Sequence, residues 1–323
     1  MQKLIIKGKK KLVGKILISG SKNATLPILA ASILTNEVKL KNVPLVKDIF
    51  TMVELLNFIG LDMKFLKNKK ILEIKNKEKN INTLAPYRLV KTMRAGVLVL
   101  GPLLTKYGKA KVSLPGGCAI GSRPVDLHLL ALKKLGAKIK IKNGYILAEA
   151  KNGLKGATIK FPSISVGATE NALLAAFKAK GKSILKNCAI EPEVKDLILF
   201  LNKMGGQIKI SGRTITISES KKNKLPITHE IIFDRIEAGT YMIASALIGK
   251  NMTIERIDPK IIKHEINTLK KMGIKNKKIK KSPKIKRKKN VKKNECYNKT
   301  IPWISYRFTS TINGLNDTSE WCI

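Results

Sequence analysis

EVKDLILFLNKMGGQIKI, residues 193–210, contains the pattern that decides the fold. Its leucines, isoleucine and phenylalanine recur at helical spacing as far as Met204, which predicts an amphipathic helix. A glycine at position 205 suits the left-handed residue that commonly ends a helix. The "GQIKI" that follows alternates polar and apolar residues, as a half-buried strand does. The stretch therefore predicts a helix, a glycine stop and a strand in immediate succession.

The same helix ending occurs four times along the chain. It reads "ELLNFIG" at Gly60, "LALKKLG" at Gly136, "LFLNKMG" at Gly205 and "NTLKKMG" at Gly273, so the spacings are 76, 69 and 68 residues. A fixed period of this kind indicates a repeated structural unit. Acids near the helix starts are expected to favour the positive end of each helix dipole; they are Asp48, Asp126, Asp196 and Asp258.

A second, small-residue helical segment precedes each of these helices. The four segments are "NATLPILAASIL", "RAGVLVLGPLL", "TENALLAAFKA" and "EAGTYMIASALI". Alanine and glycine at these positions suit close helix packing, and short β-rich runs such as "KSIL" and "MTIE" follow. Each unit is expected to be helix, strand, helix and further strands such as "AKIKI", which predicts an α/β protein built from similar units.

The net charge of +42 permits two interpretations. One is a nucleic-acid or anionic partner, because such partners favour basic surfaces. The other is A/T-rich coding, since lysine far outnumbers arginine and isoleucine and asparagine are frequent. Residues 275–299 hold 13 Lys or Arg against the single acid Glu295, so much of the excess is local.

The remaining composition favours a soluble, cytoplasmic protein. The four cysteines form no CxxC pair, which argues against a zinc cluster. Nothing suggests a disulfide framework, which fits a reducing cytoplasm. The N-terminal apolar runs are broken by Lys and Gly, unlike a signal peptide, and no apolar run is long enough for a membrane span. We expect Cys188, in the strand-like "SILKNCAI", to be a buried structural residue, and we assign His128 a structural role.

Six motifs together resemble the UDP-N-acetylglucosamine enolpyruvyltransferases of the EPSP synthase-like family, over about residues 1–274. They are "SGSKNATLPILAAS" (19–32), "TMRAGVLVLGP" (92–102), "LPGGCAIGSRPVDLH" (114–128), "SVGATENALLAA" (165–176), "EPEVKDL" (191–197) and "DRIEAGT" (234–240). The resemblance implies two domains of three units each, built around internal helices, of which four units are present here. It predicts a complete domain over 22–232 and a partial one from 1–21 and 233–274.

The segment 275–323 does not continue the repeat and is expected to be an aberrant basic tail. A frame shifted by one base turns "TIPWISYRFTSTINGLND" into a sequence similar to the next motif of the family, for a permitted choice of codons. We therefore hypothesise a one-base frame change between Gly273 and Lys299, which the nucleotide sequence tests. The resemblance then describes a truncated or frameshifted chain that is impaired or inactive as translated.

The resemblance implies transfer of the enolpyruvyl group of phosphoenolpyruvate to the 3-hydroxyl of UDP-N-acetylglucosamine, with release of phosphate and without a cofactor or metal. Cys118 matches the proton donor of the family, and the glycines that flank it favour a mobile lid. By the same resemblance Lys22 binds phosphoenolpyruvate and Asn23 the sugar, and arginines bind phosphate or carboxylate. The full set of implied binding residues is Lys22, Asn23, Arg94, Arg123, Pro124, Val125, Asp126, Leu127, Ser165, Val166 and Gly167.

Two alternatives stay open beside this function. One is a degenerate, non-catalytic product of the same gene. The other is a basic nucleic-acid-binding protein that uses residues 275–299, although this segment lacks interleaved aromatic residues. For the enzyme we expect no membrane association and no nucleic-acid partner. Asp234, Arg235 and Glu237 are expected to make interdomain contacts.

Overall fold

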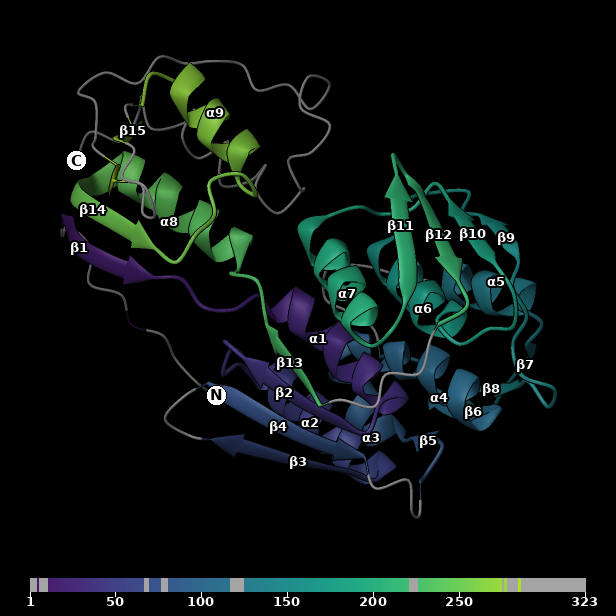
Figure 1. Cartoon of the computed structure of the whole chain (residues 1–323). Coiled ribbons are helices and arrows are strands. Elements are labelled where there is room, and N and C mark those ends of the chain that lie inside the picture. Colours follow the sequence, from purple (N-terminus) through teal and green to yellow (C-terminus); the bar gives the residue numbers. More distant parts are fainter. Residues whose placement is uncertain are drawn as a thin grey trace. The chain divides into compact units, whose positions relative to one another are not determined.

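A computed structural model of the chain divides into two compact units (Figure 1). Unit 1 consists of residues 1–19 and 233–323, and unit 2 of Gly20–Ile232. The structure describes residues 5, 11–66, 70–76, 81–116, 125–220 and 226–274, and the backbone of 276–277 and 284–285. The expectations for residues 275–323 therefore lie outside the described residues, apart from two short strands.

Unit 2 contains three copies of the predicted repeat, each a helix, a strand, a second helix and a β-hairpin. The first copy consists of α1 (Lys22–Ala31), β2 (Glu37–Lys41), α2 (Lys47–Ile59), β3 (Leu61–Leu66) and β4 (Ile71–Asn76). The second consists of η2 (Arg94–Val99), α4 (Leu100–Tyr107), β6 (Lys109–Ser113), α5 (Asp126–Lys134), β7 (Lys138–Lys142) and β8 (Tyr145–Glu149). The third consists of α6 (Val166–Ala176), β10 (Ser183–Lys186), α7 (Pro192–Lys203), β11 (Gln207–Ser211) and β12 (Thr214–Ser218).

Unit 1 contains the fourth copy, and six further short elements lie before, within or between the copies. The fourth copy consists of α8 (Arg235–Ile248), β14 (Gly249–Glu255), α9 (Lys263–Lys271), β15 (Asn276–Lys277) and β16 (Lys284–Ile285). These elements are β1 (Leu12–Leu17), η1 (Ser32–Leu34, between α1 and β2), β5 (Leu84–Ala85), α3 (Tyr87–Val90), β9 (Thr158–Lys160) and β13 (Ile227–Glu230). The expected α/β class and repeated unit are thus confirmed.

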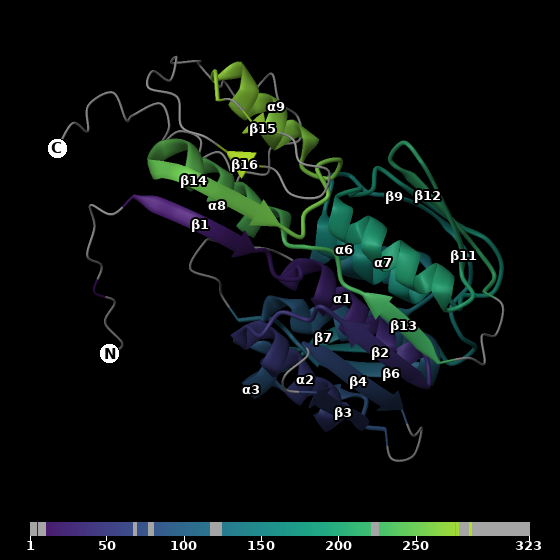
Figure 2. The same cartoon turned by 60° about the vertical axis from the view of Figure 1, so that its left-hand side comes forward.

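The four sheets share one strand order, in which a parallel pair leads into an antiparallel hairpin. The orders are β5-β6-β8-β7, β9-β10-β12-β11, β13-β2-β4-β3 and β1-β14-β16-β15. In the first two sheets the leading strand comes immediately before its own copy in the sequence. In the other two the leading strands are exchanged: β13 precedes α8 but pairs with β2, and β1 precedes α1 but pairs with β14 (Figure 2). Unit 2 therefore completes the sheet of its first copy with its own last strand, whereas unit 1 completes its sheet with β1, which the whole of unit 2 separates from β14 in the sequence.

The small-residue helices α1, α4 and α6 pack together inside unit 2. Every residue of α1 from Ala24 to Ala31 is buried, as is every residue of α6 from Ala168 to Ala176. A Cβ atom added at Gly101 of α4 would lie 2.4 Å from Asn171 Oδ1 of α6, so glycine is required at this crossing. The outer helices α2, α5 and α7 end one or two residues before the predicted glycines.

All four glycine stops have the positive φ that a left-handed residue needs. The φ angles are 118° at Gly60, 97° at Gly136, 94° at Gly205 and 84° at Gly273. This confirms the prediction, because only glycine adopts such a backbone without a steric penalty.

The predicted acids are at the helix starts in two of the four copies. Asp48 lies in the first turn of α2, and Asp126 is the first residue of α5. The prediction is wrong for Asp196, which is the fifth residue of α7 and is buried, because its carboxylate contacts β13 rather than the helix end. It is also wrong for Asp258, which lies before α9 and accepts the Lys260 N–H in a turn (2.9 Å).

Candidate functional site

The predicted binding residues that the structure describes all lie at helix N-termini of unit 2. Lys22 and Asn23 open α1, and Arg94 opens η2. Val125, Asp126 and Leu127 begin α5, and Ser165, Val166 and Gly167 begin α6. Cys118, Arg123 and Pro124 lie outside the described residues. Free backbone N–H groups and the helix dipole make such N-termini suitable for anionic groups.

The N-terminus of α1 is fixed by the side chain and backbone of Ser21. The Ala24 N–H donates to Ser21 Oγ (3.3 Å), and the Thr25 hydroxyl donates to the Ser21 carbonyl (2.7 Å). Lys22 follows this cap, and its Nζ lies 2.8 Å from Asp48 Oδ2 of α2. Both side chains of this ion pair are about 36% exposed, so the Lys22 ammonium is within reach of a solvent-borne anion.

The N-terminus of α6 repeats the same arrangement. The Ala168 N–H donates to Ser165 Oγ (3.3 Å), and the Thr169 hydroxyl donates to the Ser165 carbonyl (2.7 Å). The shared sequence is Ser-x-x-Ala-Thr in both helices. Neither threonine was predicted as part of the site, although this short pattern in the two corresponding motifs is a signal that sequence reasoning could have used.

His128 joins three of these helix starts. It lies on α5, and its Nδ1 is 3.1 Å from Nδ2 of Asn171 on α6. The Asn171 amide is oriented by two further bonds, since its Oδ1 accepts the Gly101 N–H (2.9 Å) and its Nδ2 donates to the Val97 carbonyl (3.1 Å). The same Nδ2 therefore faces Nδ1, which accepts, so the neutral ring carries its proton on Nε2.

The environment of His128 keeps the ring uncharged. Burial, and then the nearby Arg94 guanidinium, lower the pKa of His128 from 6.5 to about 4. A Cβ atom at Gly167 would lie 3.2 Å from Cε1 of this ring, so the first turn of α6 packs directly on it. The structure thus brings Arg94, the start of α5 and the Ser165–Gly167 turn together around one neutral imidazole.

A buried carboxyl group lies one residue before Asn171. Glu170 is 4% exposed, and burial, with Glu193 and then Glu191 nearby, raises its pKa well above the usual range. Its Oε1 has no hydrogen-bond partner among the described residues. Sequence reasoning did not single out Glu170, although an acid within the otherwise apolar "ATENALLAA" was a visible signal. Within the described parts of the chain, no group of His, Cys, Asp and Glu residues is arranged to hold a metal ion.

Three residues expected to make interdomain contacts have contacts within unit 1. Asp234 caps α8 by accepting the N–H groups of Ile236 (2.9 Å) and Glu237 (3.0 Å). Glu237 Oε2 accepts the Ser19 N–H (3.0 Å), and Arg235 Nη1 lies 4.0 Å from Glu265 Oε1. These bonds build the start of α8, so the interdomain role stays a prediction.

The cysteine expected to be structural is buried. Cys188 has no exposed surface, and burial raises the pKa of its thiol to about 11. It follows Asn187, at the end of β10, and packs in the core of unit 2. None of the helices in the described parts combines the length and hydropathy that crossing a bilayer requires.

The chain is similar in sequence to curated enzymes named UDP-N-acetylglucosamine 1-carboxyvinyltransferase. The family model described as EPSP synthase (3-phosphoshikimate 1-carboxyvinyltransferase) matches residues 6–311. A UDP-N-acetylglucosamine 1-carboxyvinyltransferase of Pelagibacter ubique (strain HTCC1062) is 59% identical over 276 residues, which are 85% of this chain and 66% of the relative. The protein of the same name from Endomicrobium trichonymphae is 49% identical over 275 residues, 85% of this chain and 65% of the relative. The chain thus spans about two thirds of the length of these relatives.

Solved structures share the fold at low sequence identity. The enolpyruvyl transferase NikO from Streptomyces tendae matches with a TM-score of 0.76 and 20% identity, over 88% of this chain and 67% of that one. An EPSP synthase from Acinetobacter baumannii matches with a TM-score of 0.75 and 17% identity, over 96% of this chain and 72% of that one. Since the family model matches nearly the whole chain and the fold agrees, the chain belongs to the EPSP synthase family.

Proposed function

We propose that this chain contains the nucleotide- and phosphoenolpyruvate-binding part of a UDP-N-acetylglucosamine 1-carboxyvinyltransferase, an enzyme of peptidoglycan synthesis. The observation that carries the proposal is the pair of capped helix N-termini that present Lys22 and the Ser165–Gly167 turn, in a chain 59% identical to a relative of that name. Two helix N-termini that suit anions match two substrates, of which one carries a diphosphate and the other a phosphate.

In the proposed reaction the sugar 3-hydroxyl adds to C2 of phosphoenolpyruvate while a proton reaches its methylene carbon. Cys118 supplies this proton, in keeping with a thiol in a glycine-flanked loop. As the new C–O bond forms, the proton of the sugar hydroxyl passes to a base. The tetrahedral intermediate then loses phosphate from C2, which takes up that proton, while the Cys118 thiolate regains a proton from the new methyl group, and the enolpyruvyl ether is left. The reaction needs no electron acceptor, because neither the addition nor the elimination involves a net oxidation or reduction.

Each binding residue has a proposed role in holding these groups. Lys22, Arg94 and Arg123 bind the phosphate and carboxylate of phosphoenolpyruvate, since cations at a helix start favour oxyanions. Asn23 binds the sugar. Arg123 and the run Pro124–Leu127 contact the uridine, and the Ser165–Gly167 turn binds the nucleotide phosphates. The hydrogen bond between His128 of α5 and Asn171 of α6 holds the start of α5 beside the Ser165–Gly167 turn.

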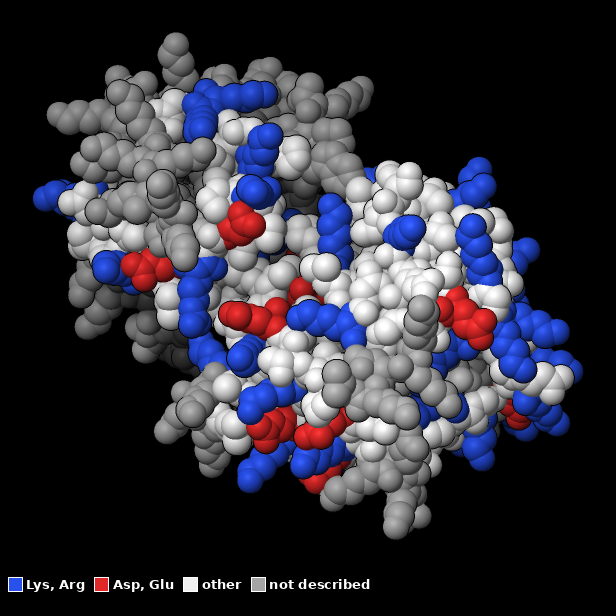
Figure 3. All heavy atoms as spheres, viewed as in Figure 1, with Lys and Arg blue, Asp and Glu red and all other residues white. Residues whose placement is uncertain are grey.

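The cellular setting follows from the proposed reaction. A peptidoglycan precursor linked to a nucleotide places the enzyme in the cytoplasm and connects it to cell-wall formation, cell shape and cell division. The alternative of a nucleic-acid-binding protein depends on residues 275–299, whose side chains lie outside the described residues. Over the described part of the face in Figure 3, Lys and Arg side chains are scattered, with acidic side chains between them.

Calorimetric titration of the whole chain with UDP-N-acetylglucosamine and with shikimate 3-phosphate tests the proposal. We expect binding of the nucleotide sugar alone, and at least about tenfold weaker binding in Arg123→Ala, because a guanidinium–oxyanion pair is a strong contact. The matched control is Arg88→Ala, since the exposed Arg88 pairs with Glu54 (3.0 Å) and is not one of the predicted binding residues. Binding of shikimate 3-phosphate with none of the nucleotide sugar would overturn the substrate assignment.

Fosfomycin labelling followed by mass spectrometry tests the role of Cys118. We expect an adduct on Cys118 and none on the buried Cys188. An assay of phosphate release from phosphoenolpyruvate then separates catalysis from binding alone. Binding and labelling without phosphate release would favour the non-catalytic alternative.

A further inference from the structure

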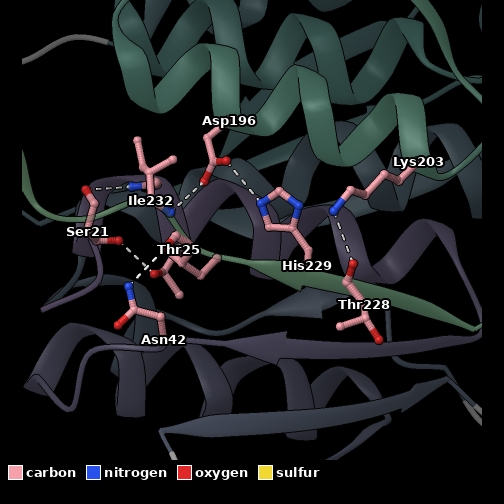
Figure 4. Close-up of polar contacts among 10 residues, drawn as sticks. Ser21, Thr25, Asn42, Asp196, Lys203, Thr228, His229 and Ile232 are labelled. Carbon is pink, nitrogen blue, oxygen red and sulfur yellow. Dashed lines mark hydrogen bonds and ion pairs between the residues drawn. The ribbon is translucent and has the colours of Figure 1, made fainter. Parts of the chain in front are cut away.

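Asp196 and His229 form a buried polar pair that the proposed reaction does not use. Asp196 lies on α7 and is 2% exposed, while His229 lies on β13 and is 3% exposed. The His229 Nε2–H donates to Asp196 Oδ1 (3.1 Å), and the Phe200 ring meets the imidazole edge-on at 5.4 Å between centroids. Figure 4 shows the carboxylate of Asp196 between the imidazole and the backbone that follows β13.

The second carboxylate oxygen of Asp196 holds the point at which the chain leaves unit 2. Oδ2 accepts the N–H of Ile232, the last residue of this unit (3.3 Å). The preceding residue is held by the first repeat, because the Ile231 N–H donates to the Lys41 carbonyl (3.0 Å) and its carbonyl accepts from Asn42 Nδ2 (3.0 Å). Both residues after β13 are therefore fixed by named hydrogen bonds.

The same segment leads directly to the N-terminus of α1. The Ile232 carbonyl accepts the N–H of Ser21 (2.8 Å), and Ser21 is the residue that caps α1 in front of Lys22. Two hydrogen bonds thus separate Asp196 from the residue that precedes Lys22. Asp196 and Ile232 are distant in sequence from Ser21, so local propensity does not set this geometry.

The pair is not explained by stability alone. His229 Nδ1 is buried without a hydrogen-bond partner among the described residues, and an unpaired buried polar atom costs free energy. An apolar ring at position 229 would remove that cost and keep the contact with Phe200, but it would leave Asp196 Oδ1 without its donor. The pair is therefore better explained by the orientation that it gives to the backbone of Ile232 than by its contribution to stability.

We propose that Asp196 and His229 are positioning residues, which hold Ile232 and, through Ser21, set the N-terminus of α1 and the location of Lys22. This inference rests on the proposed role of Lys22 in binding phosphoenolpyruvate. Asp196 and His229 do not touch the substrate in this scheme. They act through the backbone of Ile232 and Ser21.

Amide hydrogen exchange of the whole chain tests the structural half of the proposal. In Asp196→Ala and His229→Phe we expect exchange of the amides of Ser21, Ala24, Thr25 and Ile232 to accelerate about tenfold, as the loss of a hydrogen bond to a charged group allows. His229→Gln should restore protection, because its amide N–H can replace the imidazole donor. The matched control is Asn202→Ala, which removes two bonds between α7 and Ile208 (2.9 and 3.1 Å) without touching Ile232.

Ligand binding tests the functional half. We expect His229→Phe to weaken phosphoenolpyruvate binding about tenfold, and to leave the affinity for uridine diphosphate, which uses the separate Ser165–Gly167 turn, unchanged. Equal exchange at Ser21 in His229→Phe and Asn202→Ala would overturn the proposal, as would faster exchange with unaltered phosphoenolpyruvate affinity. If the unmodified chain binds no phosphoenolpyruvate, the proposed function fails, while the exchange experiment still decides whether the pair sets the N-terminus of α1.

Discussion

His128 shows how one side chain at the candidate site combines structure with electrostatics. Its ring is 3% exposed and accepts a hydrogen bond from Asn171, so protonation would place a charge in the core and abolish that bond. Burial is the main reason that its pKa is lowered to about 4, and Arg94 is the second. The residue was predicted to be structural, and it links α5 to α6.

This pKa shift predicts a loss of stability in mild acid. Unfolded His128 takes up a proton near 6.5, but the folded form does so only near 4, so between these values the unfolded state binds more protons. The free energy of unfolding should therefore fall as the pH drops from about 6.5 to about 4, by on the order of 3 kcal/mol. Urea unfolding at a series of pH values measures this loss.

His128→Gln is the matched variant, because its side-chain oxygen can accept from Asn171 but does not titrate. Its unfolding free energy should depend less on pH over the same interval than that of the unmodified chain. The comparison is needed because Glu170 has a raised pKa, so its protonation increases the free energy of unfolding as the pH falls. This effect is opposite to that of His128. Identical pH profiles for the two proteins would contradict the assigned His128 pKa.

Cys188 should be unreactive in the folded chain. Its thiol is fully buried and its pKa is raised from 9.0 to about 11, which lowers the thiolate fraction near neutral pH about a hundredfold. Alkylation followed by peptide mass spectrometry should show Cys188 modified at least about a hundredfold more slowly in buffer than in denaturant. Equal rates in the two conditions would contradict the buried position.

At the scale of elements, the first, third and fourth copies of the repeat share the conformation of the turn that follows the central strand. Asn42 and Asn187 each follow the central strand of a sheet with a φ of 59°. Each donates its side-chain amide to the carbonyl after the parallel neighbour strand, Ile231 (3.0 Å) and Phe161 (2.9 Å). Arg256 has the corresponding place in unit 1 with a φ of 61°. Three of the four copies therefore keep one backbone conformation at this turn even where the residue type changes.

The glycine stops can be tested individually at Gly136. Its φ is 97°, and an added Cβ atom would meet nothing within 4 Å, so Gly136→Ala introduces backbone strain without a clash. We expect the free energy of unfolding to fall by about 1–2 kcal/mol. The control is Lys134→Ala on the exposed end of the same helix, which should change stability by less than about 0.5 kcal/mol. Equal effects in urea unfolding would contradict the left-handed conformation.

At the scale of the whole molecule, unit 2 has the means to fold alone. One apolar core runs from Ala24 to Ile231 within it, and all three of its sheets are completed by its own strands. The core of unit 1 combines Ile18, which precedes unit 2 in the sequence, with residues from Phe233 to Ile274, which follow it. This core therefore needs both chain segments that flank unit 2.

A fragment of residues 20–232 should therefore fold with a single cooperative urea transition. A fragment of residues 20–220 lacks β13 and with it the partner of Asp196, and it leaves an open edge on β2, so we expect a lower midpoint. Circular dichroism during urea titration measures both. A midpoint for the shorter fragment equal to that of the longer one would show that β13 does not support the unit.

Much of the architecture could be predicted because it depends on neighbouring residues. The glycine stops, the small-residue helices and the strands after Gly136 and Gly205 are set by local periodicity and backbone preference. The same reasoning was wrong for Asp196, because a helix-start preference is weak next to a buried hydrogen bond with His229. The motifs indicated the candidate site residues. The contacts of Asn171 with α4, η2 and α5 became evident only in three dimensions, whereas Thr25, Thr169 and Glu170 had visible sequence signals.

By itself, the sequence determined a repeated α/β unit, the ends of its helices and the helix N-termini at which the predicted binding residues lie. The tertiary structure alone decided that β13 completes the sheet of the first repeat and β1 that of the fourth. It also decided that His128 joins three helix starts and that Asp196 fixes Ile232. The physical reason is the range of the interactions: helix periods and turns act over a few residues, while strand pairing and buried hydrogen bonds join segments that are far apart in the chain.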